Sequence, residues 1–129
     1  MIIADTDVLI DFLHGISPVH GQIARYIDAD ELATTVVNLF ELLSGGDQGK
    51  RARATRELTE SLPVLPLDFR SSERSAAVSR RLDATGQTIG MADCLIAGIA
   101  LAHGLPLLTR NRSHFARVPN LKLVEIQKV

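Results

Sequence analysis

Short runs of β-forming residues alternate with longer helical stretches along the 129-residue chain, and this alternation constrains its fold more than any other feature. Five strands are expected, at residues 1–4, 32–37, 62–67, 105–109 and 121–126. Helices are expected at residues 7–15, 17–29, 38–46, 48–62, 68–86 and 91–104. Strands that alternate with helices favour right-handed crossovers. We therefore expect an α/β fold, a single three-layer sandwich around a mostly parallel five-stranded sheet.

The composition predicts one soluble domain over residues 1–129. Hydrophobic residues make up 46% of the chain, which is enough for a buried core, and the longest apolar run, at residues 95–102, is too short to span a bilayer. A single cysteine, Cys94, excludes an internal disulfide, and no basic region precedes the apolar N-terminus. We expect a cytoplasmic protein without membrane contact, and the net charge of −1 argues against bulk polyanion binding.

Acids or amides follow the expected strands at the positions where parallel sheets bind ligands. Asp5 follows the first strand, Glu41 follows the second and Asn111 follows the fourth. Asp93 stands near the start of the apolar helix 91–104, where it is the only charged side chain before His103. Because ligands bind beyond the carboxyl ends of parallel strands, we expect Asp5, Glu41 and Asp93 to share one cleft.

Each of these polar residues also has a purely structural interpretation. Asp5 and Asp68 can cap the helices that follow them, and Asn38 with Glu41 fits a capping box. Ser17 and Pro18 fit the first positions of another helix. Asp93 can complement the dipole of its own helix. Taken singly, none of these positions decides between a structural and a functional role.

Three carboxylates in one cleft would need a positive partner. Two unit charges about 4 Å apart repel by about 4 kcal/mol at an effective dielectric constant near 20. An all-oxygen, carboxylate-rich site suits Mg²⁺ or Mn²⁺ better than zinc, which prefers histidine or cysteine ligands. Such a site serves phosphoryl transfer, in which the metal activates a water molecule.

Four segments in this order resemble the PIN-domain ribonucleases, and specifically the VapC-type toxins of bacterial toxin–antitoxin systems. The segments are DTDVLID with Asp5, TTVVNLFELLSG with Glu41, GMADCLIAGIALAHG with Asp93, and the TRN of LLTRNRSHF. The resemblance implies a PIN-like sheet of strand order 3-2-1-4-5 and Mg²⁺- or Mn²⁺-dependent endonucleolytic cleavage of RNA. It also implies a homodimer and a VapB-type antitoxin that blocks the site.

Asn111 departs from the family pattern, which commonly has a fourth acid just after the fourth strand. An amide can still coordinate a metal or hold a water molecule, but it adds no negative charge. Asp7 lies close to the first acid and can restore some of that charge. We therefore expect a site that binds its cation more weakly than one with four carboxylates.

Smaller roles are expected for residues beside the strand ends. Thr6 and Thr109 carry hydroxyls that can orient a carboxylate or a water molecule, and Arg110 and Arg112 can meet substrate phosphate at the mouth of the cleft. His114 is expected to take at most a minor part. Asp11 is expected to be a structural or surface group.

Two other functions remain open from the sequence. DTDVL also resembles the first motif of haloacid-dehalogenase-type phosphohydrolases, in which Asp5 would be the nucleophile and Asp7 the acid/base. That enzyme class needs an acidic pair after the fourth strand, where this chain has TRNRSHF. The second alternative is a non-catalytic, degenerate PIN module in which Asn111 has abolished turnover.

Overall fold

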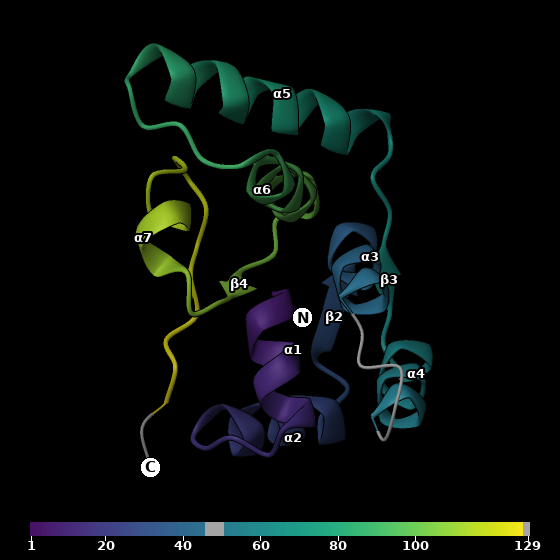
Figure 1. Cartoon of the computed structure of the whole chain (residues 1–129). Coiled ribbons are helices and arrows are strands. Elements are labelled where there is room, and N and C mark those ends of the chain that lie inside the picture. The colour runs from purple at the N-terminus through teal and green to yellow at the C-terminus, as the bar shows by residue number, and fades with distance from the viewer. Residues whose placement is uncertain (46–50, 128–129) are drawn as a thin grey trace.

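A parallel sheet forms the centre of the protein. Figure 1 shows the computed structural model, which describes residues 1–45 and 51–127. Within these residues the sheet has four strands, in the order β3-β2-β1-β4, and every pair is parallel. The strands are β1 (Ile2–Ala4), β2 (Leu32–Thr35), β3 (Val64–Leu65) and β4 (Leu107–Leu108). The expected order is therefore confirmed for the first four strands.

Seven helices connect and cover the strands in the described part of the chain. They are α1 (Thr6–Leu13), α2 (Val19–Asp28), α3 (Val36–Ser44), α4 (Ala52–Ser61), α5 (Phe69–Ala84), α6 (Met91–His103) and α7 (Arg112–Phe115). The short helix α7 was not expected from the sequence. Residues 46–50, where the expected helix over 48–62 would begin, lie outside the described residues. No helix in the described ranges is both long and apolar enough to cross a membrane.

The sheet separates two hydrophobic cores, which gives the expected three layers. On one face, Ile3 and Leu107 pack against buried residues of α5, α6 and α7. On the other face, Ala4 and Leu108 pack against α1, α2 and α4. Figure 1 shows α5 and α6 on one side of the strands and α1 and α2 on the other. Successive residues of a strand point to opposite faces, so β1 and β4 each contribute to both cores.

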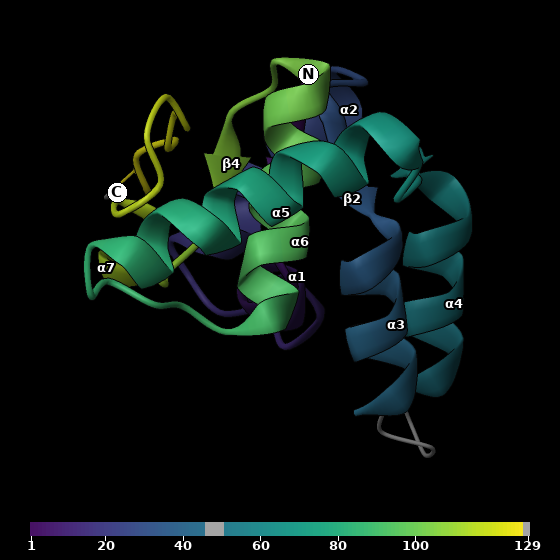
Figure 2. The same cartoon turned by 90° about the horizontal axis from the view of Figure 1, so that it is seen from above.

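Helix α6 lies under α5, as the view from above shows (Figure 2). Gly98 permits this close approach, because a Cβ at that position would lie 1.9 Å from Ser75 Oγ. The buried residues of α6 face both α5 and the sheet, which explains why the helix is apolar almost all round. The first turn of α6 carries Asp93, which lies against Asn111 and His114 in the segment that follows β4.

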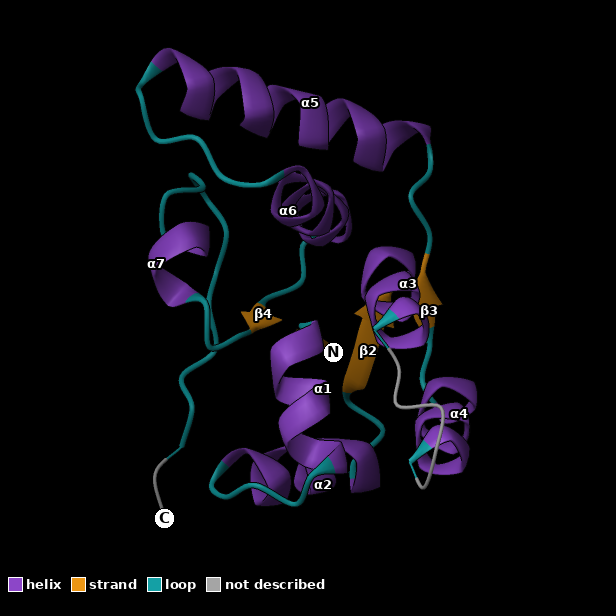
Figure 3. Cartoon of the chain, viewed as in Figure 1, coloured by secondary structure: helices purple, strands orange, loops and turns teal. Residues whose placement is uncertain are grey.

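The expected fifth strand over residues 121–126 does not form, and Figure 3 draws this segment as a loop. It contacts the sheet through one isolated parallel bridge between Leu107 and Leu123. Side chains bind the backbone beyond that bridge. Gln22, which is fully buried, donates to Glu125 O at 2.9 Å and accepts from Gln127 N at 2.9 Å. The five-stranded expectation was wrong because side chains take up backbone groups that a ladder would use.

The boundary between β2 and α3 also differs from the expectation. The strand ends at Thr35, and the β-branched Val36 and Val37 begin the helix. Thr35 is the N-cap, with its side chain accepting a hydrogen bond from Asn38 N at 3.2 Å. The expected capping box with Asn38 as the cap is therefore wrong, and the Asn38 side chain is available for another role.

Two smaller corrections concern proline. Pro18 is the N-cap of α2, which begins at Val19, so Ser17 and Pro18 stand one position earlier than expected. Strand β3 is limited to two residues because Pro63 and Pro66 flank it and have no backbone N–H to donate. By contrast, Asp68 caps α5 as expected, since its carboxylate accepts from Ser71 N at 2.9 Å.

Candidate active site

Asp5 stands at the carboxyl end of β1 and is also the N-cap of α1. Only 7% of it is exposed. Its Oδ1 accepts from Thr6 N at 2.8 Å and from Asn38 Nδ2 at 2.9 Å, and its Oδ2 accepts from Thr109 Oγ1 at 2.7 Å. The capping and the functional interpretations of Asp5 are thus compatible.

Asp5 nevertheless lacks enough positive charge around it. Burial raises the pKa of Asp5, and the nearby Asp93 carboxylate raises it further, although the bonds from Thr109, Thr6 and Asn38 act in the opposite direction. A buried carboxylate usually has a low pKa when its hydrogen bonds and charges compensate it. The direction of the shift indicates that a cation would stabilise ionised Asp5.

Glu41 reaches Asp5 through two side chains. Thr6 Oγ1 donates to Glu41 Oε1 at 2.6 Å, and Asn38 Nδ2 donates to both Thr6 Oγ1 and Asp5 Oδ1 at 2.9 Å. The structure therefore brings Thr6 and Glu41 together as expected, but adds Asn38 between the acids. The sequence could have pointed to Asn38, because it is a single amide within the apolar run VVNLF, but Asn38 was interpreted as a helix cap.

Asp7 is the second carboxylate of the DTD segment. Its Oδ2 accepts from Arg110 N at 3.0 Å and lies 3.5 Å from Thr109 Oγ1, whereas its buried Oδ1 has no hydrogen-bond partner among the described residues. Burial and then the charge of Asp5 raise the pKa of Asp7 to about 6. The backbone N–H and the charge of Arg110 lower the pKa again, but they offset these two effects only in part.

The raised pKa of Asp7 predicts a pH-dependent stability. The pKa of about 6 lies above the usual value of 3.8, so the folded state retains a proton between those values and loses stability as pH rises through them. In buffer without divalent ions, Asp7→Asn should raise the free energy of unfolding at pH 7.5 by on the order of 1 kcal/mol, allowing for partial exposure. Urea unfolding should show no such gain at pH 3.5, and a gain that is independent of pH would contradict this explanation.

Asp93 lies in the first turn of α6, where the helix dipole favours its charge. Its Oδ2 is 3.1 Å from His114 Nδ1 and 3.4 Å from Asn111 Nδ2. Asn111 and His114 also lie together, with Nδ2 and Nδ1 3.0 Å apart. An amide and an imidazole therefore occupy the place beside Asp93 where the resemblance leads one to expect a fourth acid.

The two arginines after β4 have different surroundings. Arg110 Nε pairs with Asp11 Oδ2 at 2.8 Å, and the Arg110 side chain is 54% exposed while that of Asp11 is 9% exposed. The guanidinium of Arg112 instead donates to Val124 O at 3.0 Å and Glu125 Oε1 at 2.9 Å. The structure thus places Arg110 beside the acids, and Arg112 on the C-terminal segment, where it does not join them.

The carboxylate oxygens of Asp5, Glu41 and Asp93 have the chemistry of a hydrated divalent-cation site. In residues 1–45 and 51–127, no three His, Cys, Asp or Glu side chains lie close enough together to hold a metal ion by themselves. Mg²⁺ does not need one, because it keeps several waters and is usually bound through one or two carboxylates. The raised pKa of Asp5, and an Asp7 Oδ1 without a hydrogen-bond partner in the described part of the chain, are the observations that fit a missing positive charge.

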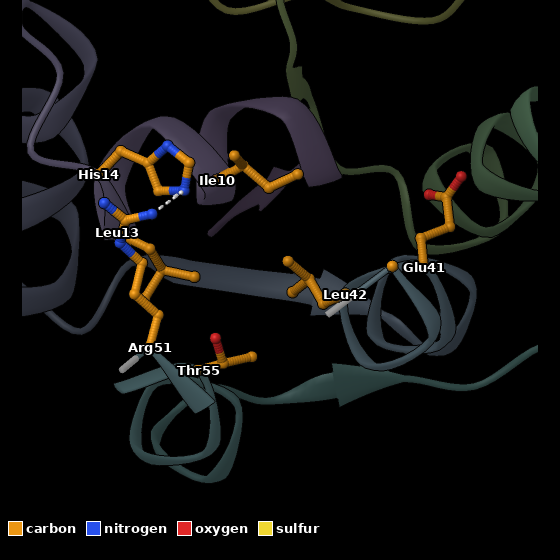
Figure 4. A pocket seen from close by; sticks show the side chains of 8 residues that line it. Ile10, Leu13, His14, Glu41, Leu42, Arg51 and Thr55 are labelled. Carbon is orange, nitrogen blue, oxygen red and sulfur yellow. Dashed lines mark hydrogen bonds between the residues drawn. The ribbon is translucent and has the colours of Figure 1, made fainter. Parts of the chain in front are cut away.

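A groove leads away from Glu41 between α1, α3 and α4 (Figure 4). It has a volume of about 330 Å³, and its walls include the apolar side chains of Ile10, Leu13 and Leu42. Figure 4 shows Glu41 at one end and the pair formed by Arg51 and His14 at the other. The groove could therefore hold an extended partner whose end covers Glu41.

Comparison with known proteins gives consistent results. The family model described as PIN domain matches residues 2–121. Ribonuclease VapC10 of Mycobacterium tuberculosis is 33% identical over 122 residues, covering 95% of this chain and 91% of the relative. VapC ribonuclease Y4jK of Sinorhizobium fredii is 34% identical over 128 residues, covering 89% and 90%. In fold, a chain of VapBC2 from Rickettsia felis, crystallised with a promoter DNA fragment, has a TM-score of 0.82 and 22% identity, covering 96% and 98%.

Proposed function

Because the chain belongs to the PIN-domain family, among its VapC ribonucleases, we propose that it is a Mg²⁺- or Mn²⁺-dependent endoribonuclease toxin of a VapBC system. The observation that carries the metal dependence is Asp5, whose pKa is raised by burial and by Asp93 at the carboxyl edge of the sheet. RNA is the substrate class, as the names of the ribonuclease relatives indicate for those proteins.

We assign Asp5, Asp93 and Glu41 as the residues that would hold the cation. A bound divalent cation would activate water for attack on phosphorus and stabilise charge on the phosphate. Thr109 and Thr6 orient the acids, since their hydroxyls donate to Asp5 Oδ2 and Glu41 Oε1 respectively. Asn111 lies against Asp93 and can offer an amide oxygen or hold a water molecule there.

Arg110 is our candidate for binding substrate phosphate. Its side chain is half exposed beside the acids, and the nearly buried Asp11 holds its guanidinium in place through a 2.8 Å ion pair. A guanidinium retains further N–H donors when one carboxylate oxygen occupies its Nε, so Arg110 can bind a phosphate oxygen while Asp11 fixes its direction. Asp11 would then be a positioning residue and not only a surface charge.

Arg110→Ala should raise the KM for RNA about tenfold, with a smaller effect on kcat, because it removes a charge-assisted bond to phosphate. Asp11→Asn should raise KM several-fold, since Arg110 remains but loses the ion pair that orients it. Steady-state cleavage of a fluorescent RNA would measure both parameters. Arg80→Ala, which removes an exposed arginine of α5, is the matched control. A fall in kcat with unchanged KM would contradict a substrate-binding role.

We propose a VapB-type antitoxin as the protein partner. The Rickettsia felis structure contains VapBC2 with DNA, which supports this type of partner for a chain of the same fold. The groove that ends at Glu41 has apolar walls and suits a segment that would cover the acids. Inhibition would then follow from exclusion of RNA from the site.

We also propose a homodimer, because α3 carries an apolar stripe open to solvent. Val36, Phe40 and Leu43 are 40%, 68% and 55% exposed, and their spacing puts them on one face of the helix. The stripe lies on the same helix as Glu41, so a second copy on this face would stand near the site. Sedimentation velocity of the purified chain measures the oligomeric state directly.

The function is tested by incubating the purified chain with total RNA in Mg²⁺, in Mn²⁺ or in excess EDTA, and sequencing the new 5′ ends. We expect cleavage at defined positions that requires either metal. Antitoxin binding without cleavage would favour the non-catalytic PIN module instead. The phosphohydrolase alternative lacks its acidic pair, because Thr109, Arg110 and Asn111 follow β4.

A further inference from the structure

Asn38 is fully buried, and every polar group of its side chain is hydrogen bonded. Its Oδ1 accepts from Thr35 Oγ1 at 2.7 Å, and its Nδ2 donates to Asp5 Oδ1 and Thr6 Oγ1 at 2.9 Å each. The orientation of the amide follows from these partners. An ionised Asp5 can only accept, so the amide nitrogen must face it and the amide oxygen must face Thr35.

This orientation sets the direction of the neighbouring hydrogen bonds. Thr6 Oγ1 accepts from Asn38, so its own proton is free to donate to Glu41 Oε1, 2.6 Å away. Thr35 therefore donates to Asn38, and Asn38 donates to Asp5 and Thr6. Thr6 in turn donates to Glu41. Asp5 and Glu41 therefore both act as hydrogen-bond acceptors in this network.

Helix capping and packing do not account for these contacts. Thr35 already caps α3, and Asn38 is the third residue of the helix. A leucine of similar size would fill the same buried space without the cost of burying an amide. The contacts of the amide are made to Thr35 and to the two residues that begin α1, Asp5 and Thr6.

We propose that Asn38 is the positioning residue of the cation site, which holds Asp5 and, through Thr6, Glu41 in a fixed relation as acceptors. This inference rests on the proposed function and assigns a role to a residue that touches neither metal nor substrate. Hydrogen-bond partners of metal ligands typically change metal affinity by about 10–100-fold when they are removed. The side chain of Asn38 is such a hydrogen-bond partner, because it donates to Asp5, which we assign as a metal ligand.

The test is calorimetric titration of Mn²⁺ alone into the full-length chain, without RNA. Asn38→Leu should raise the Kd for Mn²⁺ by about 10–100-fold. Thr6→Val removes the donor to Glu41 and one acceptor of Asn38 Nδ2 but leaves the bond from Asn38 to Asp5, so it should raise the Kd less. Gln22→Leu is the matched control, because it removes another fully buried amide that binds the C-terminal segment, and its Kd should stay within about twofold of wild type.

Thermal unfolding separates this role from general destabilisation. Asn38→Leu and Gln22→Leu are both expected to lower Tm, but only Asn38→Leu should weaken Mn²⁺ binding in the folded protein. If Asn38→Leu does not fold, Asn38→Ser keeps a small donor and should give an intermediate Kd. A Kd for the folded Asn38 variant within twofold of wild type overturns this inference alone. Absence of Mn²⁺ binding by the wild type overturns the proposed metal site and this inference with it.

Discussion

Asp5→Asn should lower kcat/KM for RNA cleavage by at least about a thousandfold, a loss on the order of 4 kcal/mol in transition-state stabilisation. Asn keeps the shape of the side chain and is itself a good N-cap, so α1 should remain capped. The change removes the buried Asp5 carboxylate, whose pKa is already raised by burial and by Asp93. We therefore expect activity to fall while Tm, measured without divalent ions, is unchanged or higher.

A second aspartate cap provides the control. Asp68 caps α5 through Ser71 N, but it lies on the surface away from the acids. Asp68→Asn should leave cleavage within about twofold of wild type. In cells, growth arrest on expression should be lost with Asp5→Asn and retained with Asp68→Asn. Arrest that survives both Asp5→Ala and Asp93→Ala would overturn the catalytic proposal.

The parallel sheet was predictable because strands alternate with helices and such units have one favoured handedness, whereas the strand order was implied only by the resemblance to PIN domains. The ends of the elements were less predictable. Val36 and Val37 have strong β propensity, yet they start α3 because Thr35 caps that helix. Residues 121–126 have the pattern of a strand, but the binding of Glu125 and Gln127 by Gln22 depends on a contact across about a hundred positions.

The acids of the site were predictable for a related reason. Asp5 directly follows an apolar strand and Asp93 is the only charged side chain before His103 in an apolar helix, and burial makes such charges rare without a function. Asn38 was seen but assigned to a cap, since a local motif explained it equally well. Arg112 was assigned to the cleft because nothing in the sequence indicates its pairing with Glu125.

Asn111→Asp should strengthen Mn²⁺ binding by about tenfold to hundredfold, because it places a further carboxylate beside Asp93. A unit charge pair about 4 Å apart is worth about 4 kcal/mol near the protein surface, and desolvation of the new carboxylate offsets part of this. Asn111 Nδ2 is 3.4 Å from Asp93 Oδ2, so the new charge would be close enough to act on the same cation. Calorimetric titration measures the change.

The same substitution should destabilise the metal-free protein. This effect distinguishes an added charge from a change in fold as the cause of tighter Mn²⁺ binding. Without cations, the new carboxylate would replace an amide donor to Asp93 with a like charge, so Tm should fall. With saturating Mn²⁺ the order should reverse, because binding stabilises the folded state in proportion to affinity. Asn120→Asp, an exposed position with φ of 68° that tolerates aspartate, makes the same chemical change elsewhere. Equal Mn²⁺ affinity in wild type and Asn111→Asp would show that missing charge does not limit the site.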